Sequence, residues 1–515
     1  MKNMKNGIPL DKNSGSATKP FLLNIFCLCV IALIVSTILI TDLRSEQIIG
    51  GSLISFVLLI IFFRDIMRYR PLYMNNYNML FLLTLMILST LILGRSFEYI
   101  FLILSDGLGF IVPETAMFGL PLAAGAMLVT LLFDFHTAIT FSFIISLLSG
   151  YWLLDAFYPI YVFVGSLTAA FSVIRCKKRS AILLGGLYII LANVLMVLII
   201  CLTKGELFSP TALSALILAI ISGIIVSAIV SLLLPFLEYL FKITTDISLL
   251  ELLDLNQPLM KNLMVTAPGT YHHSIIVGNL VESAAEVVNV NPLLARVSSY
   301  YHDIGKLKMP DYFVENQIGT ENKHDKLTPH MSSMIITNHV KEGVELAKQF
   351  KLPDVIINII KEHHGTSVMT YFYQKAKELE QPSIPEEEEY RYLGPKPQSR
   401  VSALVMMADA IEAASRVLND PTPSRISALV DKIMNNFFID GQLDECELTF
   451  KDISEIKKRF IYILTSIFHK RIDYPGFDFS EQGLHNKPAK NEKAEPSENN
   501  KGSQQDSSAS RVSKS

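Results

Sequence analysis

Charged residues are almost absent from long stretches of the first 235 residues, and this segregation constrains the fold more than any other feature. Half of the 515 residues are hydrophobic, and most of the 18% that are charged lie after these stretches. An apolar helix of about 20 residues can cross the hydrocarbon core of a bilayer. We therefore predict about eight membrane-spanning helices, at 21–41, 48–63, 78–94, 118–133, 137–154, 160–174, 182–203 and 212–234.

Basic residues in the short connections predict which side of the membrane each connection faces, because Lys and Arg are retained on the cytoplasmic side. One cluster follows the second run and another follows the sixth: Arg64, Arg68, Arg70, Arg175, Lys177, Lys178 and Arg179. Both clusters lie inside only if 95–112 does not span, so we expect an external loop or interfacial helix there. The chain after residue 234 is then cytosolic.

The order of apolar and polar stretches divides the chain into five parts. We expect a cytosolic N-terminal segment at 1–20, the transmembrane region at 21–235 and a linker helix at 236–252. Apolar residues at helical spacing, without alternating strand patterns, predict an all-helical soluble domain at 253–479. The tail at 480–515 is rich in Ser, Asn, Lys and Glu, a composition typical of disorder.

Composition also excludes several classes of function. The net charge of −3 offers no basic surface for a nucleic acid polymer. The five cysteines form no CxxC pair, so neither a zinc knuckle nor a disulfide framework is expected. The predicted spans are nearly free of charge, which disfavours a transporter with an ion pathway.

Histidines and aspartates gather in the soluble half, where eight of the eleven histidines lie between His272 and His364. YHDIGK and KEHHGT each place a doublet at the end of an apolar helix, and MMADAIEAA places Asp409 inside one. A buried carboxylate is costly unless it is paired or binds a metal. Adjacent helical side chains point about 100° apart, so a doublet can serve two neighbouring cations. These ligands suit Fe, Mn, Zn, Co or Ni better than Ca or Mg, and a metal site is favoured over buried structural polar residues.

Several segments resemble the HD domain of the 7TMR-HD family, whose members include PgpH-type cyclic di-AMP phosphodiesterases. They are APGTYHHSIIVGNL, YHDIGKLKMPDYFVENQ, NHVKEG, EHHGT, YRYLGPKPQSR and ADAIEAASR. The resemblance implies an all-α protein with a polytopic helical membrane region and a cytosolic HD domain, held in the bacterial inner membrane. That family carries a large extracytoplasmic domain between its first two spans, whereas this chain has only residues 42–47 there.

The resemblance also implies a centre with two divalent metal ions, for which iron or manganese is expected. One ion would be bound by His273, His302 and Asp409, the other by His339, His363 and His364, with Asp303 bridging them. The family pattern selects His273 over its neighbour His272. We expect His324 and His330 to be solvated or to stand behind the ligands.

By the same resemblance the substrate is a cyclic dinucleotide, with cyclic di-AMP opened to linear pApA. Asp303 and Lys306 are the expected catalytic residues, and Lys306, Arg391 and Lys396 the expected substrate contacts. The alternatives are hydrolysis of cyclic di-GMP or (p)ppGpp and a non-catalytic nucleotide-binding membrane receptor. The bilayer is a further expected partner, and a homo-oligomer is left open.

Overall fold

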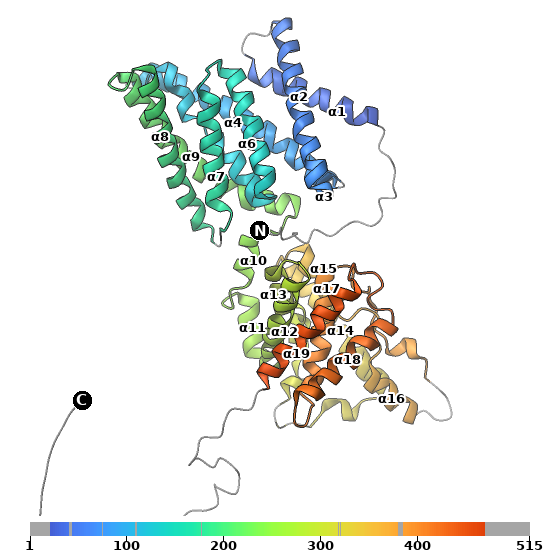
Figure 1. Ribbon diagram of the computed structural model, residues 1–515. Helices are drawn as coiled ribbons and strands as arrows, with labels where there is room; N and C mark the ends of the chain where they lie inside the picture. Colours follow the sequence, from blue (N-terminus) through green and yellow to red (C-terminus); the bar gives the residue numbers. More distant parts are fainter. Residues whose placement is uncertain are drawn as a thin grey trace, which may run out of the picture. The chain divides into compact units, whose positions relative to one another are not determined.

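The structure is a computed structural model that describes residues 21–40, 44–74, 76–108, 111–176, 178–317, 319, 321–379 and 385–468. The regular secondary structure of these residues is helical, and the predicted all-α class is confirmed (Figure 1). They contain no strand, and their one isolated bridge joins Val368 to Arg391. The segments 1–20 and 480–515, for which a cytosolic location and disorder are predicted, lie outside the described residues.

The first part of the chain consists of apolar helices. They are α1 (Phe21–Leu39), α2 (Ser45–Tyr69), α3 (Pro71–Met74), α4 (Tyr77–Leu108), η1 (Pro113–Gly119), α5 (Ala123–Leu132), α6 (Phe135–Leu153), α7 (Tyr158–Val173), α8 (Ser180–Lys204) and α9 (Pro210–Phe241). Among the described residues six helical stretches are long and apolar enough to cross a membrane, and the shorter Phe26–Leu39 and Tyr158–Val173 are also apolar. Only a few residues separate α1 from α2, so no folded domain lies between them.

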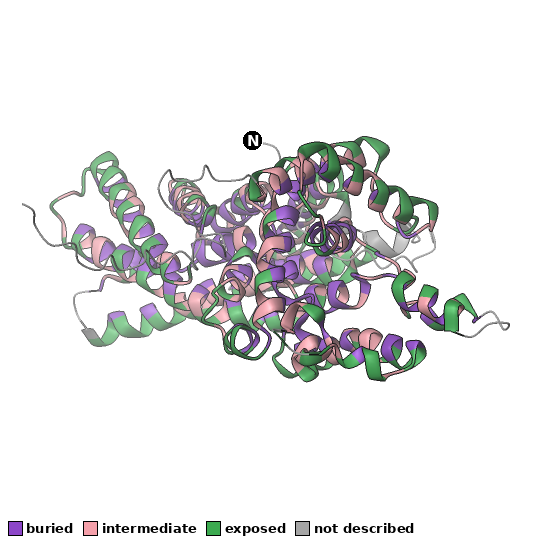
Figure 2. Ribbon diagram, turned by 90° about the horizontal axis from the view of Figure 1, so that it is seen from below, coloured by how far each residue is buried: buried purple, intermediate pink, exposed green. Residues whose placement is uncertain are grey.

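Helix α8 illustrates how such helices use their two sides. Leu183, Leu187 and Leu191 recur every four residues and are exposed, which places an apolar stripe on one face. On the other side Gly186 lies so close to Gly223 of α9 that a side chain would not fit without movement. Small residues permit this close packing of membrane helices. Figure 2 shows the same division of exposed and buried residues around the helices.

Helix α4 differs from the boundary predicted at residue 94, because it continues to Leu108 as one helix. Arg95 was expected to end the apolar run. Its guanidinium pairs with Glu98 at 2.5 Å and lies over the Trp152 ring at 5.1 Å. Because this local ion pair compensates the charge, the helix can continue through it.

The second part of the chain is a compact helical domain. Its helices are α10 (Asp246–Leu252), α11 (Pro258–Thr266), α12 (Pro268–Val287), α13 (Pro292–Tyr301), α14 (Pro329–Gln349), α15 (Asp354–Glu362), α16 (Thr370–Leu379), α17 (Arg400–Ser415), α18 (Pro423–Ile439) and α19 (Phe450–Ile467). Short 3-10 turns connect them: η2 (Ile304–Lys308), η3 (Pro310–Tyr312), η4 (Val314–Asn316), η5 (Lys323–Lys326) and η6 (Glu387–Tyr390). Proline begins five of the ten helices, at a position where its missing N–H costs no helical hydrogen bond.

The predicted linker helix at 236–252 is instead two helical pieces. Helix α9 ends at Phe241, and Lys242 has a positive φ of 53°. Thr245 then accepts a hydrogen bond from the backbone N–H of Ser248 and begins α10. A left-handed residue followed by a capping threonine stops one helix and starts another, which helical periodicity alone does not reveal.

Helix α17 forms the centre of the second domain, because every residue from Val401 to Asp409 is buried. It packs against α12, α13, α15 and α18. A helix that is apolar on all sides belongs in the middle of a core. Asp409 is therefore held among helices on several sides, and the neighbouring helices carry the other polar side chains of the site.

Candidate metal centre

Seven polar side chains from five helical regions meet inside the second domain. Helix α12 carries His273, the end of α13 carries His302 and Asp303, α14 carries His339, the end of α15 carries His363 and His364, and α17 carries Asp409. All seven residues singled out by motif are thus brought together, although they are spread over more than 130 positions of the sequence.

Gly305 allows the turn after α13 to approach α14. A Cβ atom at Gly305 would overlap the carbonyl oxygen of His339, and the backbone N of Gly343 is also within reach. Only glycine therefore fits between η2 and α14. This close approach brings Asp303 next to His339, and it explains why glycine follows the His-Asp doublet in YHDIGK.

Hydrogen bonds to the backbone orient three of the imidazoles. In His302, His339 and His363, Nδ1 lies 2.7, 2.5 and 2.7 Å from the carbonyl oxygen three residues earlier. Nδ1 therefore carries the proton and donates it to that carbonyl. This arrangement leaves Nε2 unprotonated in the neutral ring and directs it at the centre, which is the form that binds a metal.

Asp303 stands between two sets of nitrogens. Its Oδ2 lies 3.2 Å from His302 Nε2 and 3.6 Å from His273 Nε2. Its Oδ1 lies 3.3 Å from His339 Nε2 and 3.7 Å from His363 Nε2. One carboxylate thus faces both sides of the site with separate oxygens, the geometry that a bridging ligand needs.

Two overlapping groups of side chains could each hold a metal ion, since within each group the ligand atoms lie within 4.8 Å of one another. The first group is His273, His302, Asp303 and Asp409; the second group is Asp303, His339, His363 and His364. Among the described residues, Nε2 of His302 and Oδ1 of Asp303 are buried without a hydrogen bond, and Oδ2 of Asp303 lies in an ion pair with Lys306. Buried polar atoms are normally satisfied, so these atoms fit metal ligands.

The two groups differ in their affinity for protons. Burial lowers the pKa of His302, but the negative charges of Asp303 and Asp409 outweigh it and raise the pKa to about 10. Burial lowers the pKa of His339 to about 4, and it also lowers that of His364. The first group therefore attracts a positive charge, whereas burial holds His339 and His364 of the second group in the neutral form that binds a metal.

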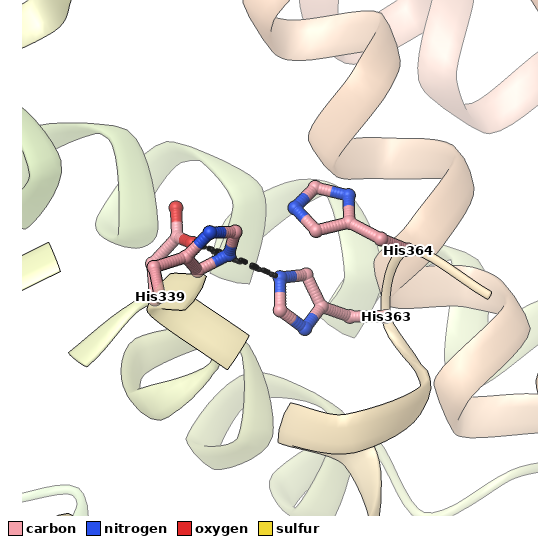
Figure 3. Close-up of side chains that lie close together, drawn as sticks. His339, His363 and His364 are labelled. Atoms are coloured by element: carbon pink, nitrogen blue, oxygen red, sulfur yellow. Dashed lines mark hydrogen bonds and ion pairs between the residues drawn. The ribbon is translucent and has the colours of Figure 1, made fainter. Parts of the chain in front are cut away.

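Figure 3 shows the rings of His339, His363 and His364 turned toward one another, with the Nε2 atoms of His339 and His363 3.3 Å apart. His364 is the most exposed of the seven ligands, with 20% of its side chain accessible. Tyr392 stacks on its ring at 4.2 Å. The second group thus provides the accessible side of the centre.

Lys306 lies at the edge of the site, where its Nζ is 2.8 Å from Asp303 Oδ2 and 2.8 Å from Glu315 Oε1. Thr270 donates a hydrogen bond to the same oxygen of Glu315 at 3.0 Å. Burial lowers the pKa of Lys306, but the charges of Asp303 and Glu315 raise it more. The lysine is consequently a fixed positive charge beside the bridging carboxylate.

The other polar residues discussed from the sequence lie elsewhere. Arg391 donates to Asp440 at 2.9 Å and to the carbonyl oxygen of Thr366, and Lys396 lies 4.0 Å from Asp444. These contacts indicate a structural role for Arg391, and its predicted contact with substrate stays a prediction. His272 and His330 are exposed, and His324 is buried against the carbonyl oxygen of Tyr312.

Sequence reasoning missed three residues of the site: Glu315, Tyr392 and Glu412. Glu412 contacts His273 Nδ1 at 2.5 Å. Its proximity to the site could have been predicted, because Glu412 follows Asp409 by three residues in the same apolar helix and therefore lies on the same face. Glu315 and Tyr392 lie inside the quoted segments ending in FVENQ and beginning YRY, but no pattern connects them with the metal ligands.

Comparison with known proteins gives consistent matches for both parts of the chain. Residues 45–245 match the family described as a 7TM receptor with intracellular HD hydrolase, and residues 270–414 match the HD domain. The cyclic-di-AMP phosphodiesterase PgpH of Bacillus subtilis is 38% identical over 76% of this chain and 54% of its own length. The protein of the same name from Listeria monocytogenes is 41% identical over 62% of this chain and 45% of its own length.

The chain thus spans about half the length of these relatives. The crystal structure of the L. monocytogenes PgpH HD domain is 45% identical and covers 42% of this chain and 100% of that chain, with a TM-score of 0.40.

Proposed function

The chain belongs to the family of 7TM receptors with an intracellular HD hydrolase, and from this we propose that it is a metal-dependent phosphodiesterase that hydrolyses cyclic di-AMP to linear pApA. One observation carries the proposal: the two oxygens of Asp303 face two separate sets of ligands. The relatives named as cyclic-di-AMP phosphodiesterases support this substrate.

In this proposal the first and second groups each hold one divalent ion, for which we favour iron or manganese. Two such ions supply an activated water and neutralise charge on the oxygens of a phosphodiester. The chain itself orients the site. The backbone carbonyls orient three of the imidazoles, and Asp303 faces both groups with separate oxygens. The partly exposed His364 leaves the outer side of the second group accessible to a phosphate.

Lys306 is the proposed source of further charge stabilisation. Its ammonium is already positioned by Asp303 and Glu315, so it need not reorganise when negative charge develops on a phosphate oxygen nearby. Tyr392 covers His364 with its ring, and a stacked aromatic residue at the accessible side is suited to contact with a base of the nucleotide. Arg391 precedes Tyr392 and Lys396 follows it in the same segment, and their contacts with Asp440 and Asp444 make them the weaker candidates for substrate contact.

The cellular setting belongs to the same proposal. We place the helices in a bacterial inner membrane with the HD domain in the cytoplasm, where cyclic dinucleotides are available. The basic residues after the second and sixth predicted spans support this orientation. Fluorescent or cysteine-accessibility labelling from either side of vesicles tests it, and light scattering of the detergent-solubilised protein tests for a homo-oligomer.

The decisive experiment uses the full chain, purified in detergent and loaded with Mn²⁺ or Fe²⁺. It is incubated separately with cyclic di-AMP, cyclic di-GMP and ppGpp, and products are separated by chromatography. We expect pApA to form from cyclic di-AMP faster than any product forms from the other two. Preference for another nucleotide would redirect the substrate assignment, and binding without turnover of all three would instead support a nucleotide-binding receptor.

A further inference from the structure

His273 differs from three other imidazoles of the centre in what its outer nitrogen contacts. The outer nitrogens of His302, His339 and His363 all face a backbone carbonyl, which is neutral. The outer nitrogen of His273 faces the carboxylate of Glu412 at 2.5 Å. His273 Nε2, on the opposite side of the ring, points at Asp409 Oδ1 at 2.9 Å.

The Glu412 carboxylate is itself held in place from the other side. Its Oε1 accepts hydrogen bonds from Arg416, one turn later in the chain, with Nε at 2.7 Å and Nη2 at 2.6 Å. Its Oε2 is left for His273. The Glu412 side chain is only 3% exposed, so water does not compete for either oxygen. Arg416, Glu412 and His273 therefore form a relay of charge-assisted hydrogen bonds that ends at the first group.

A carboxylate behind an imidazole fixes the ring and makes it a stronger metal ligand than a carbonyl does. Among the described residues only the first group has such a partner at hydrogen-bonding distance outside the ligand set; in the second group the carboxylate nearest an imidazole nitrogen, apart from the shared Asp303, is that of Asp409, itself a ligand, 3.6 Å from His364 Nδ1. The first group also contains Asp409, a second carboxylate, where the second group has a third imidazole. Both features raise the affinity of the same side of the centre for a cation.

We propose that Glu412 is a positioning residue that makes the first group the tighter of the two metal sites, so that the centre fills in order, first group before second. The inference rests on the two-metal function proposed above. It adds that the two ions are not bound equally tightly. The second group, on the accessible side, has the lower metal affinity, so its occupancy and hence the activity depend on the metal concentration.

The test measures Mn²⁺ affinity directly, in full-length variants that retain one group each. His363→Gln disables the second group and leaves the first, whereas His302→Gln does the reverse. Glu412→Gln is then added to each, and Mn²⁺ binding is followed by equilibrium dialysis with elemental analysis. In the His363→Gln background we expect Glu412→Gln to weaken Mn²⁺ binding about 10–100-fold. In the His302→Gln background the change should stay below about twofold.

Glu362→Gln is the matched control. Glu362 is another buried carboxylate, but it accepts hydrogen bonds from the backbone N–H of Gln398 and from Ser402, and it belongs to neither group. Its replacement should leave Mn²⁺ affinity unchanged in both backgrounds, and thermal unfolding followed by circular dichroism checks that every variant is folded. Arg416→Gln should weaken the first group in the same direction as Glu412→Gln, by a smaller factor.

Four results would overturn the inference. The first is an equal loss of affinity in both backgrounds, and the second is no loss in either. The third is tighter Mn²⁺ binding by the second group than by the first in the parent single-group variants. If neither single-group variant bound Mn²⁺ while the unmodified chain bound two ions, the centre would be one cooperative unit and ordered filling would be excluded. If the unmodified chain bound no Mn²⁺, the proposed function itself would fail.

Discussion

The two groups of ligands share Asp303 and lie within one domain, yet they are built from different chemistry. The first group combines two imidazoles with two carboxylates, consists of buried residues and has Glu412 hydrogen-bonded to His273 from outside the ligand set. The second group combines three imidazoles with the shared carboxylate, and its outermost member, His364, is partly accessible beneath Tyr392.

The difference shows how neighbouring histidines in one core acquire opposite properties. Around His302 the charges of two carboxylates outweigh the effect of burial, whereas around His339 burial prevails and keeps the ring neutral. The result is a buried side suited to holding a cation tightly and an accessible side suited to exchange with solvent and substrate. The following predictions test this division.

Asp303→Asn should have the largest effect, because it removes the one carboxylate common to both groups. The asparagine keeps the shape of the side chain but presents one neutral oxygen, so bound metal should fall below one ion per chain. Turnover of cyclic di-AMP should fall by about 10³-fold or more, as expected when several kcal/mol of charge stabilisation are lost. Elemental analysis and product chromatography measure the two effects. A variant that kept two ions would contradict the bridging role.

His302→Gln and His363→Gln should each remove one of the two metals, because each belongs to a single group. We expect about one ion per chain in each variant, and turnover reduced by at least about 10²-fold in both, since the proposed reaction uses both ions. The variants should differ in what remains: the ion left in His363→Gln should dissociate more slowly during dialysis. Equal dissociation rates would remove the distinction between the groups.

Lys306→Met should lower turnover without emptying either group. Lys306 is not a member of either ligand set, but its ammonium lies beside Asp303. We expect kcat to fall by about 10²-fold, the size typical of losing one fixed donor to transition-state charge, while two ions remain bound. Lys306→Arg, which keeps the charge, should recover part of the loss. Unchanged kcat with normal metal content would remove Lys306 from the proposed mechanism.

Asp440→Asn should have the smallest effect, because Asp440 lies outside both groups and serves the contact with Arg391. Burial raises the pKa of Asp440, but hydrogen bonds from Arg391 and Gln442 and the charge of Arg391 together outweigh it and lower the pKa below its ordinary value. A lowered folded-state pKa contributes stability above the unfolded-state pKa of about 4, and this stability is lost as pH falls through the folded-state value. At pH 7 the variant should therefore unfold at a slightly lower temperature, equivalent to about 1 kcal/mol or less.

The difference between Asp440→Asn and the unmodified chain should stay constant from pH 7 down to about 4 and shrink as pH falls further, which thermal melts in detergent can follow. Turnover and KM should stay within about twofold of the unmodified chain, since the pair does not touch the metal groups. A clear rise in KM would mean that Arg391 contacts the substrate, as the sequence predicts, and that its contact with Asp440 positions it for this purpose.

Much of the fold could be predicted from the sequence, because residues that become buried recur at regular positions along it. Charge-free runs indicate the apolar helices, and helical spacing indicates an all-α second domain. The boundaries that differed depend on local pairs. Arg95 continues α4 because Glu98 and Trp152 compensate its charge, and the linker breaks because Lys242 adopts a left-handed conformation. Neither the contacts of Arg95 nor the backbone conformation of Lys242 can be read from a hydropathy pattern.

The sequence by itself determined the chemical identity of the site, because residue type decides which atoms can bind a metal and motif context selects the seven side chains. Only the tertiary structure decided how those side chains divide. Placing Asp303 between His302 and His339 requires the contact of η2 with α14, which only Gly305 permits. The contact of Glu412 with His273 likewise requires that α17 packs against α12. Distances across packed helices depend on the whole core, so the asymmetry of the centre is a property of the fold.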